Sequence, residues 1–245
     1  DEVGGTCTDA ILLTISNPPT AEILTPLANE TYNDNGTVEL SGSVHDTEDA
    51  DSNILAEWTS DLDESLGVSI PDSAGAVALN VTGLSYGTHL LTLTATDSVG
   101  LTGTDTVTIE INASPTAPVV SILPALPATT DPLILSIDTP STDPDDPSYI
   151  PNYDIVWHKN GVLEPAHNGQ TTIDASVTES LDTWAVYVTA TDGLATSAAG
   201  SAAVAIGNSI PSITTATVSP LVGLDTDTFT VTPTGWVDLD GDPEG

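Results

Sequence analysis

An internal repeat of about 95 residues constrains the fold of this chain more than any other feature of its sequence. The segment Thr-Ala-Thr-Asp occurs twice, ending at Asp97 and at Asp192, which are 95 residues apart. Linker-like segments that contain proline begin at Asn17, Asn112 and Asn208, at spacings of 95 and 96 residues. Landmarks that share one period indicate a structural unit that recurs along the chain.

The repeat predicts two complete domains and two partial ones. The pieces are the final strand of a preceding repeat over residues 1–17, complete domains over 18–112 and 113–208, and the opening strands of a further repeat over 209–245. The first piece shows the same spacing as the later repeats, since Asp1 lies 16 residues before Asn17, just as Asp192 lies 16 residues before Asn208. Each complete piece has the usual size of a small domain, about 100 residues.

Short segments in each repeat alternate apolar and polar residues. The alternation is clear in Val38–Val44, Leu91–Ala95 and Val107–Ile111, where Thr, Ser or Glu stands between the apolar positions. This period of two is typical of half-buried strands. Further strands are expected at Leu133–Ile137, Ile155–Trp157, Trp184–Thr191 and Ala202–Ile206, separated by turn residues. About seven strands per repeat predict an all-β chain of tandem seven-stranded immunoglobulin-like β-sandwiches in a linear array.

Two tryptophans stand at similar places in the two complete domains. Trp58 lies 41 residues after Asn17, and Trp157 lies 45 residues after Asn112. Both fall on the expected third strand, where a large aromatic side chain fills the space between two sheets. We therefore predict that both are core residues. The alternative is an exposed position at which they stack on carbohydrate.

The charge of the chain excludes some partners. Thirty-six Asp and Glu residues stand against one basic residue, Lys159, which gives a formal net charge of −35. Binding to nucleic acid or to an anionic membrane surface requires clustered Lys and Arg, so neither is expected. Because 39% of the residues are hydrophobic, a packed β protein is favoured over a disordered chain. The negative charge must be balanced by cations or salt from outside.

Acidic residues recur at the same place in each repeat. Alternating strand directions return two loops of a sandwich to the pole at which the chain enters, so their oxygens and that of the linker Asn are expected to meet there. Calcium takes six to eight oxygen ligands in flexible geometry, whereas zinc prefers the scarce Cys and His. The predicted calcium ligands are Asn17, Asp46, Glu48, Asp49 and Asp97 in the first domain, Asn112, Asp143, Asp145 and Asp192 in the second, and Asn208, Asp238, Asp240 and Asp242 in the last. The alternative is that these residues simply form turns and keep the surface soluble.

The combined motifs resemble a known group of repeats. The Asn-x-x-Pro linkers, Ser43–Asp49 ahead of Trp58–Asp63, Gly87–Asp97, and Thr142–Asp145 ahead of Tyr153–Gly161 look like the tandem PKD-like and cadherin-like repeats of large bacterial surface proteins. The resemblance covers essentially the whole chain. It lacks the Trp-Asp-Phe-Gly-Asp-Gly signature of PKD repeats and the Asp-x-Asn-Asp-x-x-Pro linkers of cadherins. It implies an extracellular or cell-surface location.

No catalytic motif stands out in the sequence. The four histidines lie in unrelated contexts, and neither Gly-x-Ser-x-Gly nor His-Glu-x-x-His occurs. His45, beside Asp46, is expected to make a structural hydrogen bond at the end of a strand. Cys7 is the only cysteine, so no disulfide forms within the chain. No apolar run reaches the length of about 18 residues that a membrane helix requires. We therefore do not expect an enzyme or a membrane span.

The leading hypothesis for function is an extracellular spacer, such as a surface stalk, an adhesin shaft or a fibre, stiffened by calcium at the domain junctions. Its partners would be neighbouring repeats and a surface or matrix ligand that the sequence does not identify. One alternative is a filament subunit that pairs with identical chains by strand addition. The other alternative is a carbohydrate- or protein-binding accessory module of a secreted enzyme, which predicts aromatic side chains exposed on a sheet face.

Overall fold

The computed structural model describes residues 15–208, 210–238 and 240. Contacts between residues divide the chain into two compact units, Asp1–Ala113 and Ser114–Gly245, called units 1 and 2 below. The described residues form strands and loops together with three single-turn 3₁₀ helices, η1 (Asp51–Asn53), η2 (Pro165–His167) and η3 (Ala175–Val177). The predicted all-β, immunoglobulin-like fold is thereby confirmed. The strand predicted over 1–17 lies almost wholly outside the described residues.

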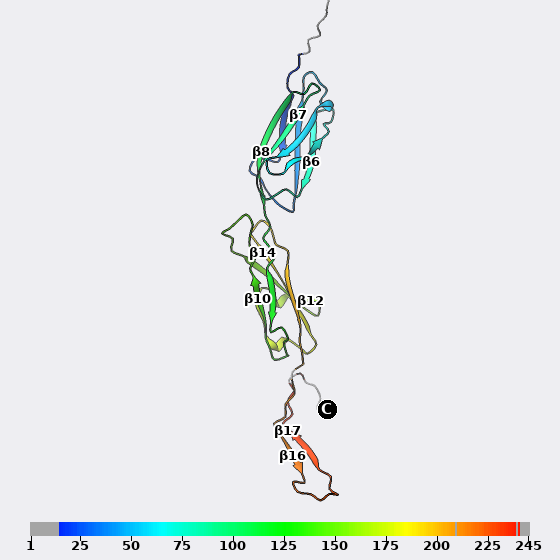
Figure 1. Cartoon of the computed structure of the whole chain (residues 1–245), viewed down its shortest axis with the longest axis vertical. Helices are drawn as coiled ribbons and strands as arrows, with labels where there is room; N and C mark the ends of the chain where they lie inside the picture. The colour runs from blue at the N-terminus through cyan, green and yellow to red at the C-terminus, as the bar shows by residue number, and fades with distance from the viewer. Residues whose placement is uncertain (1–14, 209, 239, 241–245) are drawn as a thin grey trace, which may run out of the picture. The chain divides into compact units, whose positions relative to one another are not determined.

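Unit 1 is a sandwich of two sheets (Figure 1). The first sheet has the order β1–β3–β6, and the second has the order β2–β8–β7–β4–β5. The strands are β1 (Thr20–Thr25), β2 (Thr31–Asn33), β3 (Thr37–His45), β4 (Leu55–Ser60), β5 (Glu64–Ser69), β6 (Ala76–Thr82), β7 (Gly87–Thr96) and β8 (Thr102–Asn112). All neighbouring strands are antiparallel except β2 and β8, which are parallel.

The core of unit 1 lies between the two sheets, as the alternation predicted. Along β7, Leu91, Leu93 and Ala95 are fully buried, while the threonines between them face outward. Trp58 on β4 is also fully buried, and its indole Nε1 donates a hydrogen bond to Ser69 Oγ at 3.2 Å. The predicted core position of Trp58 is confirmed, because the indole fills the space between the sheets and its one polar atom has a partner.

Unit 2 contains a second sandwich. Its smaller sheet has the order β13–β10–β9, and its larger sheet has the order β12–β11–β14–β15. The strands are β9 (Val119–Leu123), β10 (Leu133–Thr139), β11 (Asn152–Lys159), β12 (Val162–Leu163), β13 (Thr172–Ile173), β14 (Thr183–Thr191) and β15 (Gly200–Ala205). The expected strands are therefore present, with ends that differ from the expected ones by up to three residues.

Two tryptophans form the centre of the second core. Trp157, on β11, is fully buried, and its Nε1 donates to the carbonyl oxygen of Gln170 at 2.9 Å. Trp184, on β14, meets it edge to face, with ring centroids 6.4 Å apart and planes at 71°. Leu133 and Ile173 close the core from the facing sheet. The predicted core role of Trp157 is confirmed.

The hairpin of β16 (Thr215–Ser219) and β17 (Thr230–Thr234) follows the second sandwich (Figure 1). Its strands are antiparallel, as are β1–β3 and β9–β10, the pairs that open the two sandwiches. Among the described residues these two strands pair only with each other. Phe229 and Val231 are accordingly more than half exposed.

A glycine at the start of the last strand lets the first strand pass close by in each sandwich. A Cβ at Gly103 would overlap the carbonyl oxygen of Pro19, and a Cβ at Gly200 would overlap that of Pro118. The two glycines lie 97 residues apart, so this contact belongs to the repeat. Because the overlapping atom is backbone, a larger residue there forces the strands apart.

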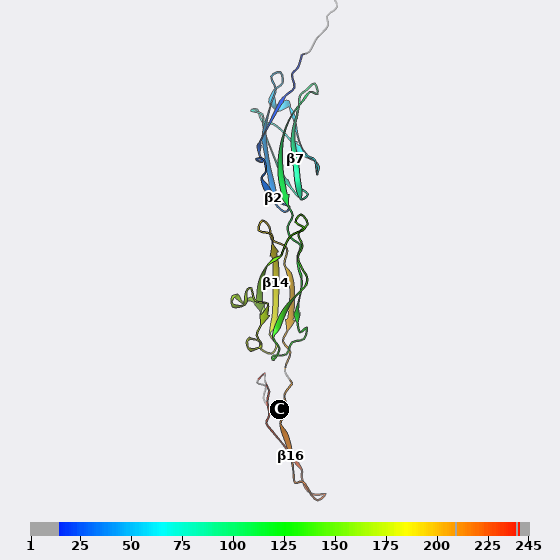
Figure 2. The ribbon, with the colours of Figure 1, turned by 90° about the vertical axis from the view of Figure 1, so that its left-hand side faces the viewer.

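The two sandwiches differ in how the last strand is flanked. In unit 1, Thr31–Asn33 of β2 pair in parallel with Glu110–Asn112 of β8, and Figure 2 shows β2 alongside the sheet that contains β7. Backbone hydrogen bonds extend this pairing from Asn29 to Asp34. In unit 2 the corresponding contact is a single parallel bridge between Ala128 and Gly207. Among the described residues, the parallel pairing at the chain end is therefore longer in unit 1 than in unit 2.

Candidate functional site

Three segments meet at one end of unit 1, which we call the entry pole: residues 16–17, 46–53 and 97–101. Residues 46–53 belong to the loop between β3 and β4, and residues 97–101 connect β7 to β8. Hydrogen bonds join each loop to the other and to the entering segment. The convergence expected from the alternating strand directions is therefore present in unit 1.

Asp46 and Asp97 each build the turn in which they lie. Asp46 Oδ1 accepts hydrogen bonds from the backbone N–H groups of Glu48 at 2.7 Å and Asp49 at 2.8 Å. Asp97 Oδ1 accepts from the N–H groups of Val99 at 3.0 Å and Leu101 at 2.7 Å, and the residue is only 6% exposed. Short acidic side chains stabilise turns in this way, because they satisfy N–H groups that no strand partner reaches.

Glu48 and Asp49 join the segments. The Asp49 carboxylate accepts from the N–H of Ser98 at 2.9 Å and from its hydroxyl at 3.0 Å. The Glu48 carboxylate accepts from the side-chain amide of Asn17 at 2.7 Å. Ser98 lowers the pKa of Asp49, first through its N–H, and the Thr47 hydroxyl contributes most to lowering the pKa of Glu48. Both side chains are thus held as carboxylates.

The strand-end role predicted for His45 is confirmed. His45 is the last residue of β3, and its Nδ1 lies 2.9 Å from Asp51 Oδ2. The other oxygen of Asp51 accepts from the N–H of Asp46 at 3.4 Å. The histidine therefore fixes the start of the loop at the entry pole.

The entry pole fits a metal ion only in part. Most of its carboxylate oxygens already accept N–H or O–H groups, whereas Asp46 Oδ2 is buried without a hydrogen-bond partner. Across residues 15–208, 210–238 and 240, no three His, Cys, Asp or Glu side chains are arranged to hold a metal ion. Calcium binding by the predicted residues stays a prediction.

In unit 2, Asp143 lies near the corresponding carboxylates Asp145 and Asp192. Asp143 is 7% exposed, and its Oδ1 accepts from the N–H of Asp145 at 3.4 Å. Burial, the contact with Asp145, and repulsion from Asp145 and Asp192 raise the pKa of Asp143 to about 6. Asp192 Oδ1 accepts from the N–H groups of Leu194 and Ala195, both at 2.7 Å, as Asp97 does in unit 1.

The remaining predicted ligands lie in other settings. Asn112 donates from its side-chain amide to the carbonyl oxygen of Ala113 at 2.9 Å. Asn208 accepts from the Ser180 hydroxyl at 3.4 Å, and Asp238 accepts from the N–H of Asp240 at 2.9 Å. Asp242 lies outside the described residues. The structure therefore brings together the predicted residues of unit 1 and, in unit 2, Asp143 with Asp145 and Asp192.

Sequence reasoning missed the hydroxyl groups that hold the acidic loops. Ser98 joins the two loops of the entry pole, and the Ser16 hydroxyl donates to Asp97 Oδ2 at 3.3 Å. Asp146 uses Ser148 locally in the same chemical role, at 2.8 Å to its N–H and 2.6 Å to its hydroxyl. The available signal was a serine directly before Asn17 and directly after Asp97.

The only lysine of the chain forms a partly buried ion pair. Lys159 Nζ lies 2.8 Å from Asp182 Oδ2, with the side chains 22% and 7% exposed. The Asp182 carboxylate also accepts from the side-chain amide of Asn160 and from the N–H of Glu179, each at 2.8 Å. Contact with Asp182 raises the pKa of Lys159. Burial alone would raise the pKa of Asp182, but its partners, Lys159 first, lower it.

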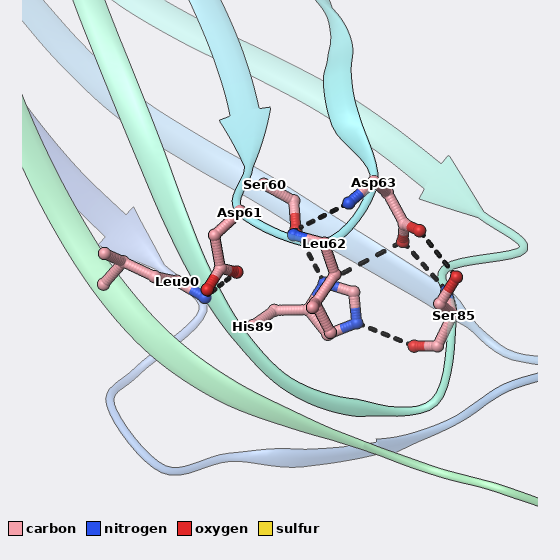
Figure 3. A network of polar contacts seen from close by, with 7 residues as sticks. All are labelled: Ser60, Asp61, Leu62, Asp63, Ser85, His89 and Leu90. Carbon is pink, nitrogen blue, oxygen red and sulfur yellow. Dashed lines mark hydrogen bonds and ion pairs between the residues drawn. The ribbon is translucent and has the colours of Figure 1, made fainter.

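A buried serine and histidine, Ser60 and His89, lie with the partly exposed Asp63 at the hairpin between β4 and β5, as Figure 3 shows. Ser60 Oγ lies 2.7 Å from His89 Nδ1, and Asp63 Oδ2 lies 3.8 Å from the same nitrogen. The other ring nitrogen, Nε2, lies 2.7 Å from the carbonyl oxygen of Ser85. A carbonyl oxygen only accepts, so Nε2 carries a proton, and in the neutral imidazole Nδ1 accepts from the Ser60 hydroxyl.

The geometry of Ser60, His89 and Asp63 fits a structural role at the hairpin. In a catalytic triad the imidazole bridges Ser and Asp through its two nitrogens, whereas here both face Nδ1. His89 is fully buried, and Ser60 Oγ accepts from the N–H groups of Leu62 and Asp63. Asp63 in turn accepts from the N–H and hydroxyl of Ser85 at 2.9 and 2.6 Å. The network closes the hairpin and ties it to the start of β7.

Comparisons with known proteins return similarities of structure only. No protein-family model and no curated protein sequence matches the chain. Among solved structures, a titin I-band fragment, I67–I69, is 11% identical over 82% of this chain and 69% of that chain, with a TM-score of 0.39. Fibronectin(III)-like modules of CbhA from Clostridium thermocellum are 14% identical over 77% and 94%, with a TM-score of 0.33. A BSP domain of a biofilm-associated protein is 16% identical over 79% and 30%, with a TM-score of 0.28.

These values are too low to carry a functional comparison. The fold assignment therefore rests on the strand order of the two sandwiches. A functional proposal must rest on the residues of this chain itself. Among the described residues, no helix is long and apolar enough to cross a membrane.

Proposed function

We propose that the chain is an extracellular, non-enzymatic spacer whose sandwiches carry tension between an anchor and a binding element. The observation that supports this most directly is the parallel pairing of β2 with β8 in unit 1. The chain enters unit 1 just before β1 and leaves it after β8. Tension applied at the two ends of the unit therefore loads β1, which pairs with β3, and then β2 and β8, which lie side by side.

Parallel terminal strands resist pulling because their hydrogen bonds are loaded together. When the ends of β2 and β8 are drawn apart, the strands slide along each other, and the bonds between them must break at nearly the same time. The N–H groups of Asn29, Asp34 and Glu110 add to this pairing, at 2.8, 2.9 and 2.9 Å from their acceptors. In unit 2, Gly207 donates the corresponding bond, to Pro127 at 2.7 Å. Unit 1 should therefore resist a higher force than the second sandwich.

Single-molecule force spectroscopy of the chain between two marker domains tests this proposal. We expect two unfolding events, each adding a contour length of about 30 nm, which is about 95 residues of extended chain. A Gly/Ser insertion of about twenty residues after Ile150, which is 85% exposed, lengthens only the second sandwich's event by about 7 nm. The lengthened event should occur at the lower force. Unfolding without resolvable force, or a lengthened event at the higher force, would overturn the proposal.

A second candidate function is calcium binding at the entry pole. The buried, unpartnered oxygen of Asp46 supports it, because a desolvated carboxylate oxygen without a donor is stabilised by a cation. Asp51 lies beside it, since one of its oxygens accepts from the N–H of Asp46 at 3.4 Å. Binding would require Glu48 and Asp49 to exchange some N–H and hydroxyl contacts for the ion.

Calorimetry with calcium chloride, after removal of bound metal, tests this second function separately. Asp46→Asn keeps the oxygen that accepts two N–H groups but replaces the unpartnered one, so it should abolish the heat of binding. Asp72→Asn is the matched control, because Asp72 Oδ1 likewise accepts two N–H groups, from Ala74 and Ala76. Calcium at a hundred times its Kd should stabilise the wild type by about 2.7 kcal/mol. Equal binding by both variants, or none by the wild type, would exclude the site and leave the spacer proposal standing.

A further inference from the structure

The outward side of the large sheet in unit 2 has an aromatic half and a polar half. We call this surface the outer face and define it by Asn152, Asp154, Val156 and His158 of β11, Tyr187, Thr189 and Thr191 of β14, and Ser201 and Ala203 of β15. Their alternation with the buried Ile155, Trp157, Val186 and Val188 places them on the side away from the core. Cross-strand neighbours on this face are Val156 with Tyr187 and Asp154 with Thr189.

The aromatic half offers a ring that is open to solvent. The rings of His158 and Tyr187 lie 5.1 Å apart at 55°, and Tyr187 is 42% exposed. On the side of β15, Tyr187 stands opposite Ser201, whose short side chain leaves the ring uncovered. Leu163 of β12, opposite His158, is 46% exposed and extends the apolar surface. An amphipathic aromatic on a flat sheet suits ligands with both apolar and hydroxylated faces.

The polar half is slightly hollowed and has unused hydrogen-bonding groups. A cavity of about 120 Å³ is lined by Asn152, Asp154, Thr189, Ala190, Thr191 and Thr196. The Thr191 hydroxyl is engaged, since it donates to the carbonyl oxygen of Ala195 at 2.8 Å. The side chains of Asn152, Asp154 and Thr189 make no hydrogen bond within the described part of the chain. The carboxylate of Asp154 and the hydroxyl of Thr189 therefore lie in the row next to Tyr187 on this face, and the amide of Asn152 lies one row farther.

The charge of the chain selects among possible occupants. With a formal charge of −35, the chain repels nucleic acids, acidic or sulfated glycans and a second copy of itself. An uncharged ligand escapes this repulsion. A pyranose ring has an apolar C–H face that stacks on an aromatic ring, together with a rim of hydroxyls that both donate and accept. The apolar face of the sugar matches the aromatic half of the outer face, and its hydroxyls match the polar half. The two halves are adjacent along β14.

We propose that the outer face of unit 2 binds a neutral saccharide. One sugar ring stacks on Tyr187 beside His158, and its hydroxyls reach Asp154, Thr189 and Asn152 at the hollow. The cavity is smaller than a whole sugar ring, so the site takes one edge of a residue in an oligosaccharide and binds it weakly, with a Kd of about 1 mM. A spacer needs no ligand. A failure to bind saccharide would therefore leave the proposed function unaffected, and a failure of the proposed function would leave saccharide binding unaffected.

Titration of the isotope-labelled full chain with neutral tetrasaccharides of glucose, xylose, mannose and N-acetylglucosamine tests the proposal by NMR. At least one should shift the amide signals of Val156, Tyr187 and Thr189. Tyr187→Ala should weaken the binding at least about tenfold, and Asp154→Ala severalfold. Tyr86→Ala is the matched control, because Tyr86 is 51% exposed in unit 1 and should leave binding unchanged. Since both tyrosines are exposed, circular dichroism should show both variants folded.

Several outcomes would overturn the proposal. The first is the absence of shifts on the outer face with every neutral tetrasaccharide at about ten times the expected Kd. The second is an equal loss of binding in Tyr86→Ala and Tyr187→Ala. The third is a sulfated tetrasaccharide that binds more tightly than its neutral counterpart. The fourth is self-association that Tyr187→Ala abolishes in sedimentation velocity, which would make the outer face an interface between copies of the chain.

Discussion

Replacing Lys159 with methionine removes the only positive charge that faces the buried carboxylate of Asp182. Methionine keeps most of the length and the apolar stem of lysine, so packing beside Trp184, whose ring centroid lies 5.8 Å from Nζ, is largely retained. Asp182 then keeps only its hydrogen bonds from Asn160 and Glu179. The substitution therefore isolates the cost of an uncompensated charge in the loop before β14.

The expected loss follows from burial. Breaking a buried ion pair by removing one partner costs about 3–5 kcal/mol. The Lys159 side chain is 22% exposed, so solvent already screens part of the attraction, whereas Asp182 at 7% is nearly enclosed. We expect Lys159→Met to lower the free energy of unfolding of unit 2 by about 2–3 kcal/mol at pH 7. Unit 1 should be unaffected, because the ion pair lies entirely in the other sandwich.

The effect should depend on pH in a defined direction. The pKa of Asp182 is lowered in the folded chain, so its contribution is present above its unfolded pKa of about 3.9 and is lost as the pH falls through the folded value. The pKa of Lys159 is raised, so its contribution is present below about 10.4 and is lost as the pH rises through the folded value. The difference between wild type and variant should be constant from about pH 5 to pH 9 and should shrink on either side.

Differential scanning calorimetry at several pH values measures the difference directly. The control is the double variant Lys159→Met with Asp182→Asn. It removes the carboxylate charge that has lost its lysine partner, so it should recover part of the lost stability. A loss below about 0.5 kcal/mol at pH 7 would refute the assignment, because that is the size of an ordinary surface substitution. A double variant as unstable as Lys159→Met would refute it as well, since it would place the cost in packing.

Two further predictions concern backbone packing and the buried histidine. Gly200→Ala should destabilise the second sandwich, and Gly103→Ala unit 1, by about 2 kcal/mol each in calorimetry, because the new methyl group meets backbone. Gly207→Ala, whose Cβ would lie 3.4 Å from the nearest atom, should cost far less, and equal costs would contradict this explanation. Ser60→Ala should cost unit 1 about 2 kcal/mol, because it removes the hydrogen-bond partner of the buried His89 Nδ1 and of two partly buried N–H groups. Unchanged urea denaturation would show that water replaces the hydroxyl.

The elements that follow from alternation could be predicted from the sequence. A period of two is a property of the strand itself, so β7, β8, β11 and β14 were placed correctly, and the alternation along β4 places Trp58 on the buried side. Strand ends were less accurate. They depend on where a partner strand stops, which a single sequence does not encode locally.

The candidate site could be predicted only in outline. Strand direction brings the loops that contain Asp46 and Asp97 to one pole, and this needs no side-chain detail. Which oxygen meets which donor depends on turn dihedrals, so the use of Ser98 by Asp49 and of Asn17 by Glu48 did not follow from the sequence. Short strands were harder still. The three residues of β2, for example, do not show alternation.

The scarcity of basic residues explains why backbone N–H groups hold the acidic loops. A chain with 36 carboxylates and one lysine cannot stabilise them by ion pairs, so the remaining donors are backbone amides, hydroxyls and carboxamides. Loops of a sandwich have unpaired N–H groups at its poles, where strands end, and a short carboxylate side chain reaches them within its own turn. Asp46, Asp97 and Asp192 all do so. At these three positions the carboxylates therefore lie where the strands of a sandwich end and N–H groups lack a strand partner, and there they stabilise the turns.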